Sequence, residues 1–329
     1  MAPSSLIARR LRWSLSLIVY GGAVALAGCT ARPPVQVIAA DGVLCDITRR
    51  LAASDLTVAC LLEPGDDPHQ FRLTPQQSRA LADAQLVLIN GYGLTPALSD
   101  QPNSLAVAER AVPSSPLLNT PESDSGEHHD AHDHGDRDPH VWHDPRQAAA
   151  MVQVVAQQLE QLKPSASRAI ASRATAMTTV LQQLDRWNRA QFATLPGTRP
   201  LATSHRAFAS LARAYGLQEW PVVDATSSSD SLRPQAFQAV VHNLQRQKVP
   251  MLFAEQLPAG KGLQRISTLS GVPLAPAALV ADGLAKNTGE PGNLISTLSD
   301  NTCLIVRGLR GRCDRTSQRS LIQSWLAIR

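Results

Sequence analysis

Residues 145–195 read PRQAAAMVQVVAQQLEQLKPSASRAIASRATAMTTVLQQLDRWNRAQFATL, and this stretch organises the rest of the chain. It is rich in Ala, Gln, Leu and Arg and is broken once, at Lys163 and Pro164. Because proline is well tolerated in a first helical turn, Pro164 is expected to open a long helix that ends near Leu195. Roughly 30 residues at about 1.5 Å each would span about 45 Å. The pattern alone fits a stiff connector between two domains and an ordinary surface helix of the second domain equally well.

Short apolar runs of strand length alternate with helical patterns on both sides of this stretch. The runs before it are Val35–Ala40, Leu56–Leu62, Leu86–Asn90 and Leu105–Ala108, and those after it are Leu201–Ser204, Trp220–Asp224, Pro250–Glu255 and Pro273–Val280. Helices are expected near Gly42–Ala53 and Thr74–Ala84. Strands that alternate with helices predict parallel sheets. The expected fold class is therefore α/β, with two lobes that each carry a mostly parallel four-stranded sheet flanked by helices.

The N-terminus has the pattern of a secretory signal. Arg9, Arg10 and Arg12 precede an uncharged apolar run from Trp13 to Leu26. A membrane-spanning anchor is the alternative, but the run is short of the about 20 residues that cross a bilayer. Leu26-Ala27-Gly28-Cys29 resembles a bacterial lipobox, which implies cleavage before Cys29, acylation of its thiol and a lipid tether to a membrane.

The charge balance argues against a nucleic-acid partner. The formal net charge of the 329 residues is +4, but from Cys29 onward there are 28 basic and 27 acidic residues. A basic surface that would attract phosphates is therefore not expected. We expect no nucleic-acid binding and a monomeric protein.

Export would place Cys45, Cys60, Cys303 and Cys313 in an oxidising compartment, where disulfides persist. Four cysteines allow three connectivities, and the sequence does not choose among them. Our hypothesis is the local pairing, Cys45 with Cys60 and Cys303 with Cys313.

Histidines are concentrated in one region of the chain. Six of the nine fall between residues 128 and 143: His128, His129, His132, His134, His140 and His143. The segment 119–137 is too polar to offset its ordering entropy, so it is expected to be a mobile loop. Imidazole suits borderline metals such as zinc, so the loop is a candidate for weak metal binding through its histidines and His143.

Four residues at the ends of expected strands are candidate metal ligands. His69 and His140 each follow an Asp-Pro pair, and proline makes these turns stiff. His205 follows the first strand of the second lobe, and Asp282 follows its last one. Ligands in open α/β sheets bind beyond the carboxyl ends of strands, so the four could converge between the lobes. Any one of these histidines taken singly is more commonly a structural or surface residue.

These stretches resemble the metal-binding solute-binding proteins of bacterial zinc and manganese ABC importers, the cluster A-I family. The similarity covers roughly Val35 to Leu309, and its matching stretches are Pro64–Phe71, Asn90–Leu94, Asp138–Trp142, Ser204–Phe208, Tyr215–Leu217 and Phe253–Glu255. The resemblance implies two α/β lobes joined by a long rigid helix, with one metal ion held between them by His69, His140, His205 and Asp282. It also implies delivery of that metal to a membrane permease driven by an ATPase.

The resemblance favours zinc as the transported ligand. Zinc-specific members carry a His- and Asp-rich loop just before the second ligand, and manganese members tend to have a carboxylate at the third position, where this chain has His205. His143 stands where the family more often has an apolar residue, so it could be an orienting group, an extra loop ligand or simply exposed.

The sequence therefore predicts an exported, lipid-anchored zinc receptor, periplasmic or on the cell surface, and not an enzyme. One alternative is a manganese or iron receptor of the same type. Another is a zinc hydrolase, for which Glu63 and Glu255 would be the candidate bases. The expected domains are a signal peptide (1–28), a tether (29–34), an N-terminal lobe (35–162) containing the loop 119–137, a linker helix (163–196) and a C-terminal lobe with its tail (197–329).

Overall fold

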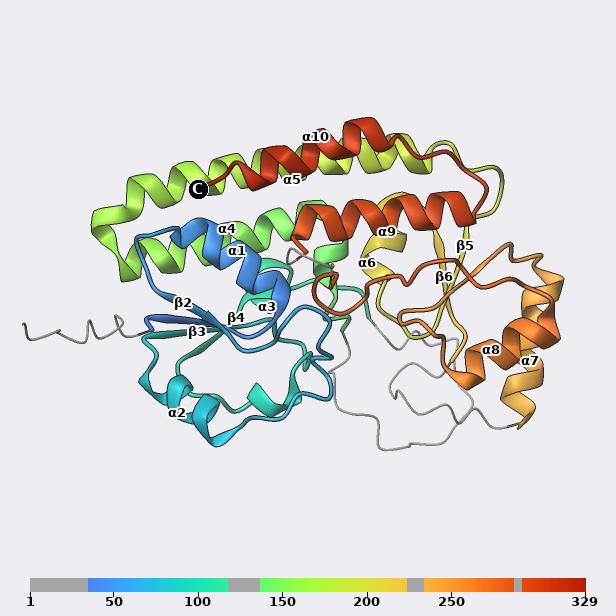
Figure 1. The fold of residues 1–329 in the computed structure, drawn as a ribbon, viewed down its shortest axis with the longest axis horizontal. Helices are drawn as coiled ribbons and strands as arrows, with labels where there is room; N and C mark the ends of the chain where they lie inside the picture. The colour runs from blue at the N-terminus through green and yellow to red at the C-terminus, as the bar shows by residue number, and fades with distance from the viewer. Residues whose placement is uncertain (1–34, 118–136, 224–233, 287–291) are drawn as a thin grey trace, which may run out of the picture. The chain divides into compact units, whose positions relative to one another are not determined.

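The apolar runs of the first half of the chain form a parallel sheet in the computed structural model (Figure 1). The structure describes residues 35–117, 137–223, 234–286 and 292–329, so the predicted signal peptide and Cys29 lie outside the described residues. The strands are β1 (Val37–Ala39), β2 (Val58–Cys60), β3 (Leu86–Ile89) and β4 (Ser104–Ala106), in the order β2-β1-β3-β4. All pairs are parallel, with Val37 opposite both Val58 and Leu86.

Helices cover this sheet, and its central strand is buried on both faces. Val37 and Ala39 pack in one apolar core with helices α1 and α4, whereas Ile38 and Ala40 pack in a second core with Leu81 of α2. Successive strand residues point to opposite faces, so a strand buried on both sides is apolar at every position. This is the reason that the sequence shows β1 as a continuous apolar run.

The helices follow the strands closely in the chain. Their bounds are α1 (Gly42–Ala52), α2 (Pro75–Asp83), α3 (Val107–Ala111), α4 (Pro145–Leu162), α5 (Ser167–Phe192), α6 (Ala209–Tyr215), α7 (Pro234–Arg246), α8 (Lys261–Ser270), α9 (Leu294–Gly308) and α10 (Arg315–Leu326), with short 3₁₀ turns η1 (Pro96–Leu98), η3 (Val141–His143) and η4 (Pro164–Ala166). None of the described helices is both long enough and apolar enough to cross a bilayer.

The second sheet has three strands among the described residues, one fewer than predicted. These are β5 (Pro200–Thr203), β6 (Gln218–Pro221) and β7 (Leu252–Phe253), all parallel and in the order β6-β5-β7. The predicted strand Pro273–Val280 makes only an isolated bridge, between Leu252 and Leu274. Pro273 and Pro276 lack the amide hydrogens that a continuous ladder requires.

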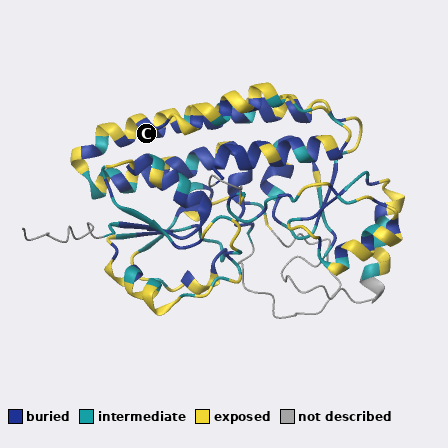
Figure 2. Cartoon of the chain, in the orientation of Figure 1, coloured by how far each residue is buried: buried dark blue, intermediate teal, exposed yellow. Residues whose placement is uncertain are grey.

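The long helix packs in the cores of both sheets. The break expected at Lys163 and Pro164 is present, and α5 then runs for 26 residues. Its residues from Ile170 to Trp187 pack in the core with α1 and α4, whereas Phe192 at its end packs in the core with Leu201 of β5. Figure 2 shows the buried face of α5 turned toward the helices below it and an exposed face on the other side. A helix fixed in two cores acts as a stiff connector.

Two disulfides lie within these elements. Cys45 of α1 bonds to Cys60 of β2, and Cys303 of α9 bonds to Cys313 just before α10. Both match the local pairing that we hypothesised from the sequence. The first joins a helix to the strand that follows it, and the second holds the turn between the last two helices.

The C-terminal tail folds back onto the helices of the first half. Leu321 and Trp325 of α10 are buried in the core of α1, α4 and α5. Trp325 Nε1 donates to Asp46 Oδ2 of α1 at 2.8 Å, and the Arg50 guanidinium lies over the indole ring. Asp46 Oδ2 also accepts from the amide of Leu294 at the start of α9 (2.9 Å). One carboxylate therefore ties together three helices.

Replacing Trp325 by alanine is expected to lower the free energy of unfolding by about 3–5 kcal/mol, because it empties a large buried site and removes the indole donor to Asp46. Urea unfolding of the disulfide-bonded protein measures this. Leu326→Ala is the matched control, because Leu326 is the next residue on α10 and is 46% exposed. Equal urea midpoints for the two variants would contradict the conclusion that α10 packs in the core of α1, α4 and α5.

Candidate metal centre

His69 lies in a turn at the carboxyl end of β2. Its backbone amide donates to Asp67 Oδ1 at 2.9 Å, so the first Asp-Pro-His sequence forms an Asx turn. Gly65, two residues before Asp67, has φ +90°, a conformation that favours glycine. Proline and this local hydrogen bond give the histidine a stiff support.

His140 is held in a second turn of the same kind. Its amide donates to Asp138 Oδ1 at 2.9 Å, and its Nδ1 lies 2.8 Å from the same oxygen. Asn90, at the end of β3, donates from Nδ2 to the carbonyl of Pro139 at 2.8 Å. Asp138, His140 and Asn90 are all buried. The turn is thus held by its own carboxylate and by the neighbouring strand.

His205 follows β5 and is oriented by Glu255, which follows β7. The amide of His205 donates to Glu255 Oε1 at 3.1 Å, and its Nδ1 contacts Glu255 Oε2. Parallel strands place their carboxyl ends at the same edge of a sheet, which explains why residues 50 positions apart meet here. The contact at Nδ1 turns Nε2 toward Asp282.

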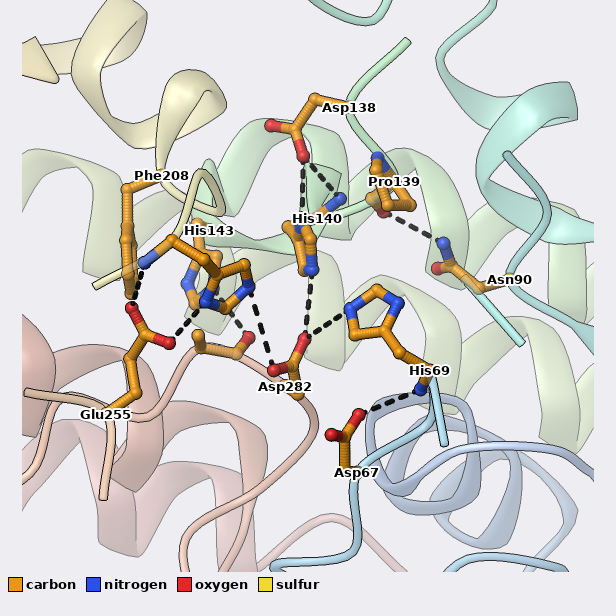
Figure 3. A network of polar contacts seen from close by, with 12 residues as sticks. Asp67, His69, Asn90, Asp138, Pro139, His140, His143, Phe208, Glu255 and Asp282 are labelled. Atoms are coloured by element: carbon orange, nitrogen blue, oxygen red, sulfur yellow. Dashed lines mark hydrogen bonds and ion pairs between the residues drawn. The ribbon is translucent and has the colours of Figure 1, made fainter. Parts of the chain in front are cut away.

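Asp282 lies between the imidazoles of His69 and His140 (Figure 3), and its second oxygen faces His205. Its Oδ1 is 3.2 Å from His69 Nε2 and 3.0 Å from His140 Nε2, and its Oδ2 is 3.8 Å from His205 Nε2. Each of the four residues offers one ligand atom, and these atoms all lie within 4.8 Å of one another. The structure therefore brings together all four ligand candidates that the sequence suggested.

The charges of this cluster are strongly coupled. Burial acts to lower the pKa of His140, but its hydrogen bonds to the carboxylates of Asp138 and Asp282 outweigh burial and raise this pKa to about 10. The pKa of His205 is also raised, because Glu255 and Asp282 outweigh the opposing effect of burial. Burial alone would raise the pKa of Asp282, but the histidines hold it well below its usual range. Without a metal ion, His140 keeps its proton at neutral pH.

This donor set suits a divalent cation. Three imidazole nitrogens and one carboxylate oxygen match the ligand types of four-coordinate zinc. Within the described part of the chain, His205 Nε2 is buried without a hydrogen-bond partner, although it faces the carboxylate of Asp282. A buried ring nitrogen directed into a cluster of this composition is available to a metal ion once its proton is displaced. Carboxylates on Nδ1 of His140 and His205 would orient the rings, as such groups do in known metal sites.

His143 does not have the accessible position expected of a loop ligand. His143 is 1% exposed, and its Nε2 lies 3.0 Å from the carbonyl oxygen of Ala281. Its ring packs against that of Phe208, tilted by 39° with ring centroids 4.6 Å apart. The turn η3 directs the side chain into the interior, so of the three roles that the sequence left open for His143 the exposed one is wrong. Burial lowers its pKa to about 4 and keeps the ring neutral. The four other loop histidines, His128, His129, His132 and His134, lie outside the described residues.

Sequence reasoning missed the orienting role of two carboxylates. Asp138 belongs to the Asp-Pro-His sequence itself, so its spacing from His140 was a usable local signal. Glu255 was considered only as a hydrolytic base, but in the structure it is occupied by the amide and ring of His205. Glu63 is exposed and its amide donates to Asp66 Oδ2 at 2.8 Å, outside the imidazole cluster.

Comparison with known sequences and structures gives consistent matches along most of the chain. The sequence model of the family described as "Zinc-uptake complex component A periplasmic" matches residues 37–308. The zinc-binding protein TroA of Treponema pallidum is 26% identical over 285 residues, covering 83% of this chain and 88% of TroA. The manganese ABC transporter substrate-binding lipoprotein PsaA of Streptococcus anginosus is 22% identical over 302 residues, covering 89% of this chain and 97% of PsaA.

Solved structures show the same fold. The periplasmic zinc-binding protein TroA of T. pallidum superposes with a TM-score of 0.73 at 25% identity, covering 84% of this chain and 99% of TroA. The Fe(III)-bound YtgA of Chlamydia trachomatis superposes with a TM-score of 0.74 at 22% identity, covering 85% of this chain and 100% of YtgA.

Proposed function

Since the chain belongs to the family of periplasmic A components of zinc-uptake complexes, we propose that it captures zinc at the cluster of His69, His140, His205 and Asp282. Proteins of this family are extracytoplasmic metal-binding receptors of ABC importers, which hand their metal to a permease and its ATPase. They are substrate-binding proteins and not enzymes, which excludes the hydrolase alternative.

The observation that carries the zinc assignment is the composition of the cluster. Three imidazoles and one carboxylate have their ligand atoms within 4.8 Å of one another. Imidazole suits zinc, whereas manganese favours carboxylate, carbonyl and water oxygens. A cluster with one carboxylate and three nitrogens is therefore better matched to zinc.

Manganese or iron is the second candidate metal. Relatives named for manganese, and a fold relative with bound Fe(III), support this alternative. The third ligand position discriminates between zinc and manganese, and there this chain has the imidazole of His205 and not a carboxylate. Glu255 supplies a carboxylate nearby, but it contacts His205 Nδ1, the nitrogen remote from Asp282.

The histidine-rich segment and the lipid anchor complete the proposal. Leu117 and Arg137 form an antiparallel bridge, so the chain leaves and rejoins the first lobe at one place, three residues before His140. A segment with His128, His129, His132 and His134 that starts there would collect zinc weakly and close to the tight site. Acylation at Cys29 would tether the receptor near its permease, and several relatives are named as lipoproteins.

Competition titration of the metal-free protein with zinc, manganese and iron(II) against a chromophoric chelator tests which metal the site prefers. We expect tight binding of one zinc ion, with manganese weaker by at least about a hundredfold. The variant His205→Glu should reduce the difference between the affinities for zinc and manganese, because it replaces an imidazole by a carboxylate. His242→Glu, at an exposed position of α7, is the matched control and should leave this difference in affinity unchanged. Manganese that displaces zinc at comparable concentration from the unmodified protein would refute the zinc assignment.

A further inference from the structure

Asp282 lies in a segment without regular secondary structure, so its position depends on side chains that hold its backbone. Asn301 of α9 accepts from the amide of Val280 through Oδ1 (3.0 Å) and donates from Nδ2 to the carbonyl of Val280 (2.7 Å). Thr297, one turn earlier on α9, accepts from the amide of Ala285 at 3.1 Å. These bonds hold the segment on both sides of Asp282 and come from the C-terminal half of the chain.

Leu279 and Ala281 are buried, but one side of this segment borders a cavity. A cavity of about 580 Å³ lies between the stretch 275–280 and α9, and Val280, Ala285, Thr297 and Asn301 are among its lining residues. An open cavity supplies few dispersion contacts to its walls. The hydrogen bonds to the backbone therefore help to fix the position of Asp282 on that side.

His143 hydrogen-bonds to Ala281, the residue directly before Asp282, and it comes from the other lobe. Its Nε2 donates to the carbonyl of Ala281 at 3.0 Å, and both His143 and Ala281 are buried. Figure 3 shows the ring of His143 beside Phe208, close to the centre of the cluster. His140 caps the turn η3 and His143 ends it. One short turn therefore carries the candidate ligand His140 and the residue that holds the backbone next to Asp282.

The ring of His143 also contacts the segment that carries the third candidate ligand. It packs at a tilt against the ring of Phe208, three residues after His205, and Phe208 is fully buried. The amide of Phe208 donates to Glu219 Oε1 at 2.7 Å, so this aromatic residue is itself held in place. His143 therefore touches the supports of both His205 and Asp282 from the turn that carries His140.

We propose that His143 is a positioning residue: its donor to Ala281 fixes the Asp282 carboxylate against the imidazoles of the first lobe and slows zinc release. This inference rests on the proposed function and adds a residue that does not itself ligate the metal. A leucine would fill the same space without donating a hydrogen bond, leaving the buried carbonyl of Ala281 unpaired. Small displacements of a ligand change both the coordination geometry and the rate of dissociation.

The test compares His143→Leu and His143→Gln with the unmodified full-length protein. Zinc release is followed in a chelator chase, and coordination geometry is followed by the visible absorption of the cobalt(II)-loaded protein. His143→Leu should release zinc about tenfold faster and change the cobalt spectrum, and His143→Gln, whose amide can donate, should recover part of both. His242→Leu, on the exposed face of α7, is the matched control and should behave as the unmodified protein.

Two outcomes overturn the inference. One is a leucine variant with the original rate and spectrum, and the other is a glutamine variant that is no better than the leucine variant. If His143→Leu does not fold, His143→Asn replaces it, because its amide is too short to reach the same carbonyl while it stays polar. Failure of the unmodified protein to bind zinc would refute the proposed function instead, so the two failures are distinguishable.

Discussion

Replacing Asp282 by alanine is expected to weaken zinc binding by at least about a hundredfold. Structural zinc sites bind with about 10–16 kcal/mol, so one of four ligands accounts for about 3 kcal/mol, or roughly two decades in affinity. Asp282 is the one candidate ligand that contacts the other three, through His69, His140 and His205. Its loss also removes the only negative charge among the four, which would otherwise offset part of the charge of the metal.

Chelator competition with the metal-free variant measures this effect. Asp83→Ala is the matched control, because Asp83 is an exposed aspartate at the end of α2. Circular dichroism of both variants shows whether the fold is kept. If the Asp282→Ala protein is folded and binds zinc as tightly as Asp83→Ala, Asp282 is not a zinc ligand.

The affinity for zinc is expected to rise with pH by about tenfold per unit for each proton that the metal displaces, between about pH 6 and pH 9. The pKa of His140 in the metal-free protein is raised to about 10 by its two carboxylate partners, and the pKa of His205 is raised by Glu255 and Asp282. His140 therefore carries a proton at neutral pH, and zinc has to displace it; the raised pKa of His205 favours its protonated form in the same direction. The pKa of Asp282 is lowered, so this ligand carries no proton in that range.

Titrations at several pH values, with calorimetry in buffers of different ionisation enthalpy, give the number of protons released per zinc ion. At pH 7 we expect release of at least about one proton. Asp138→Asn removes the carboxylate on His140 Nδ1, which lowers the pKa of that ring and should flatten the pH dependence above about pH 7. A flat affinity from pH 6 to pH 9 in the unmodified protein would contradict the protonation assigned to His140.

Most of the fold could be read from local patterns, and the failures have physical causes. The first sheet follows its four apolar runs, although the run Leu105–Ala108 contributes only Leu105 and Ala106 to β4 before α3 begins. The run Pro273–Val280 has the apolar character of a strand but forms a single bridge, because its prolines cannot donate. Prolines inside that run were the signal that argued against a fourth strand.

The position of His143 could not be predicted from its neighbours in the sequence. Its sequence neighbours, next to a loop of four other histidines, indicate a metal-collecting role. Its burial depends on the carbonyl of Ala281 and the ring of Phe208, which lie 138 and 65 positions further along the chain. Contacts of this kind leave no periodicity or spacing in the sequence.

The sequence by itself determined the strand and helix alternation, the break before Pro164 and the two stiff turns that present His69 and His140. These features depend on backbone restrictions and on neighbours within a few residues, which a linear pattern records. Only the tertiary structure decided that four side chains between positions 69 and 282 meet within 4.8 Å, that Asp138 and Glu255 orient two of the rings, and that α10 packs on α1. Those contacts join residues far apart in the chain, and their geometry follows from the packing of two sheets around a shared helix.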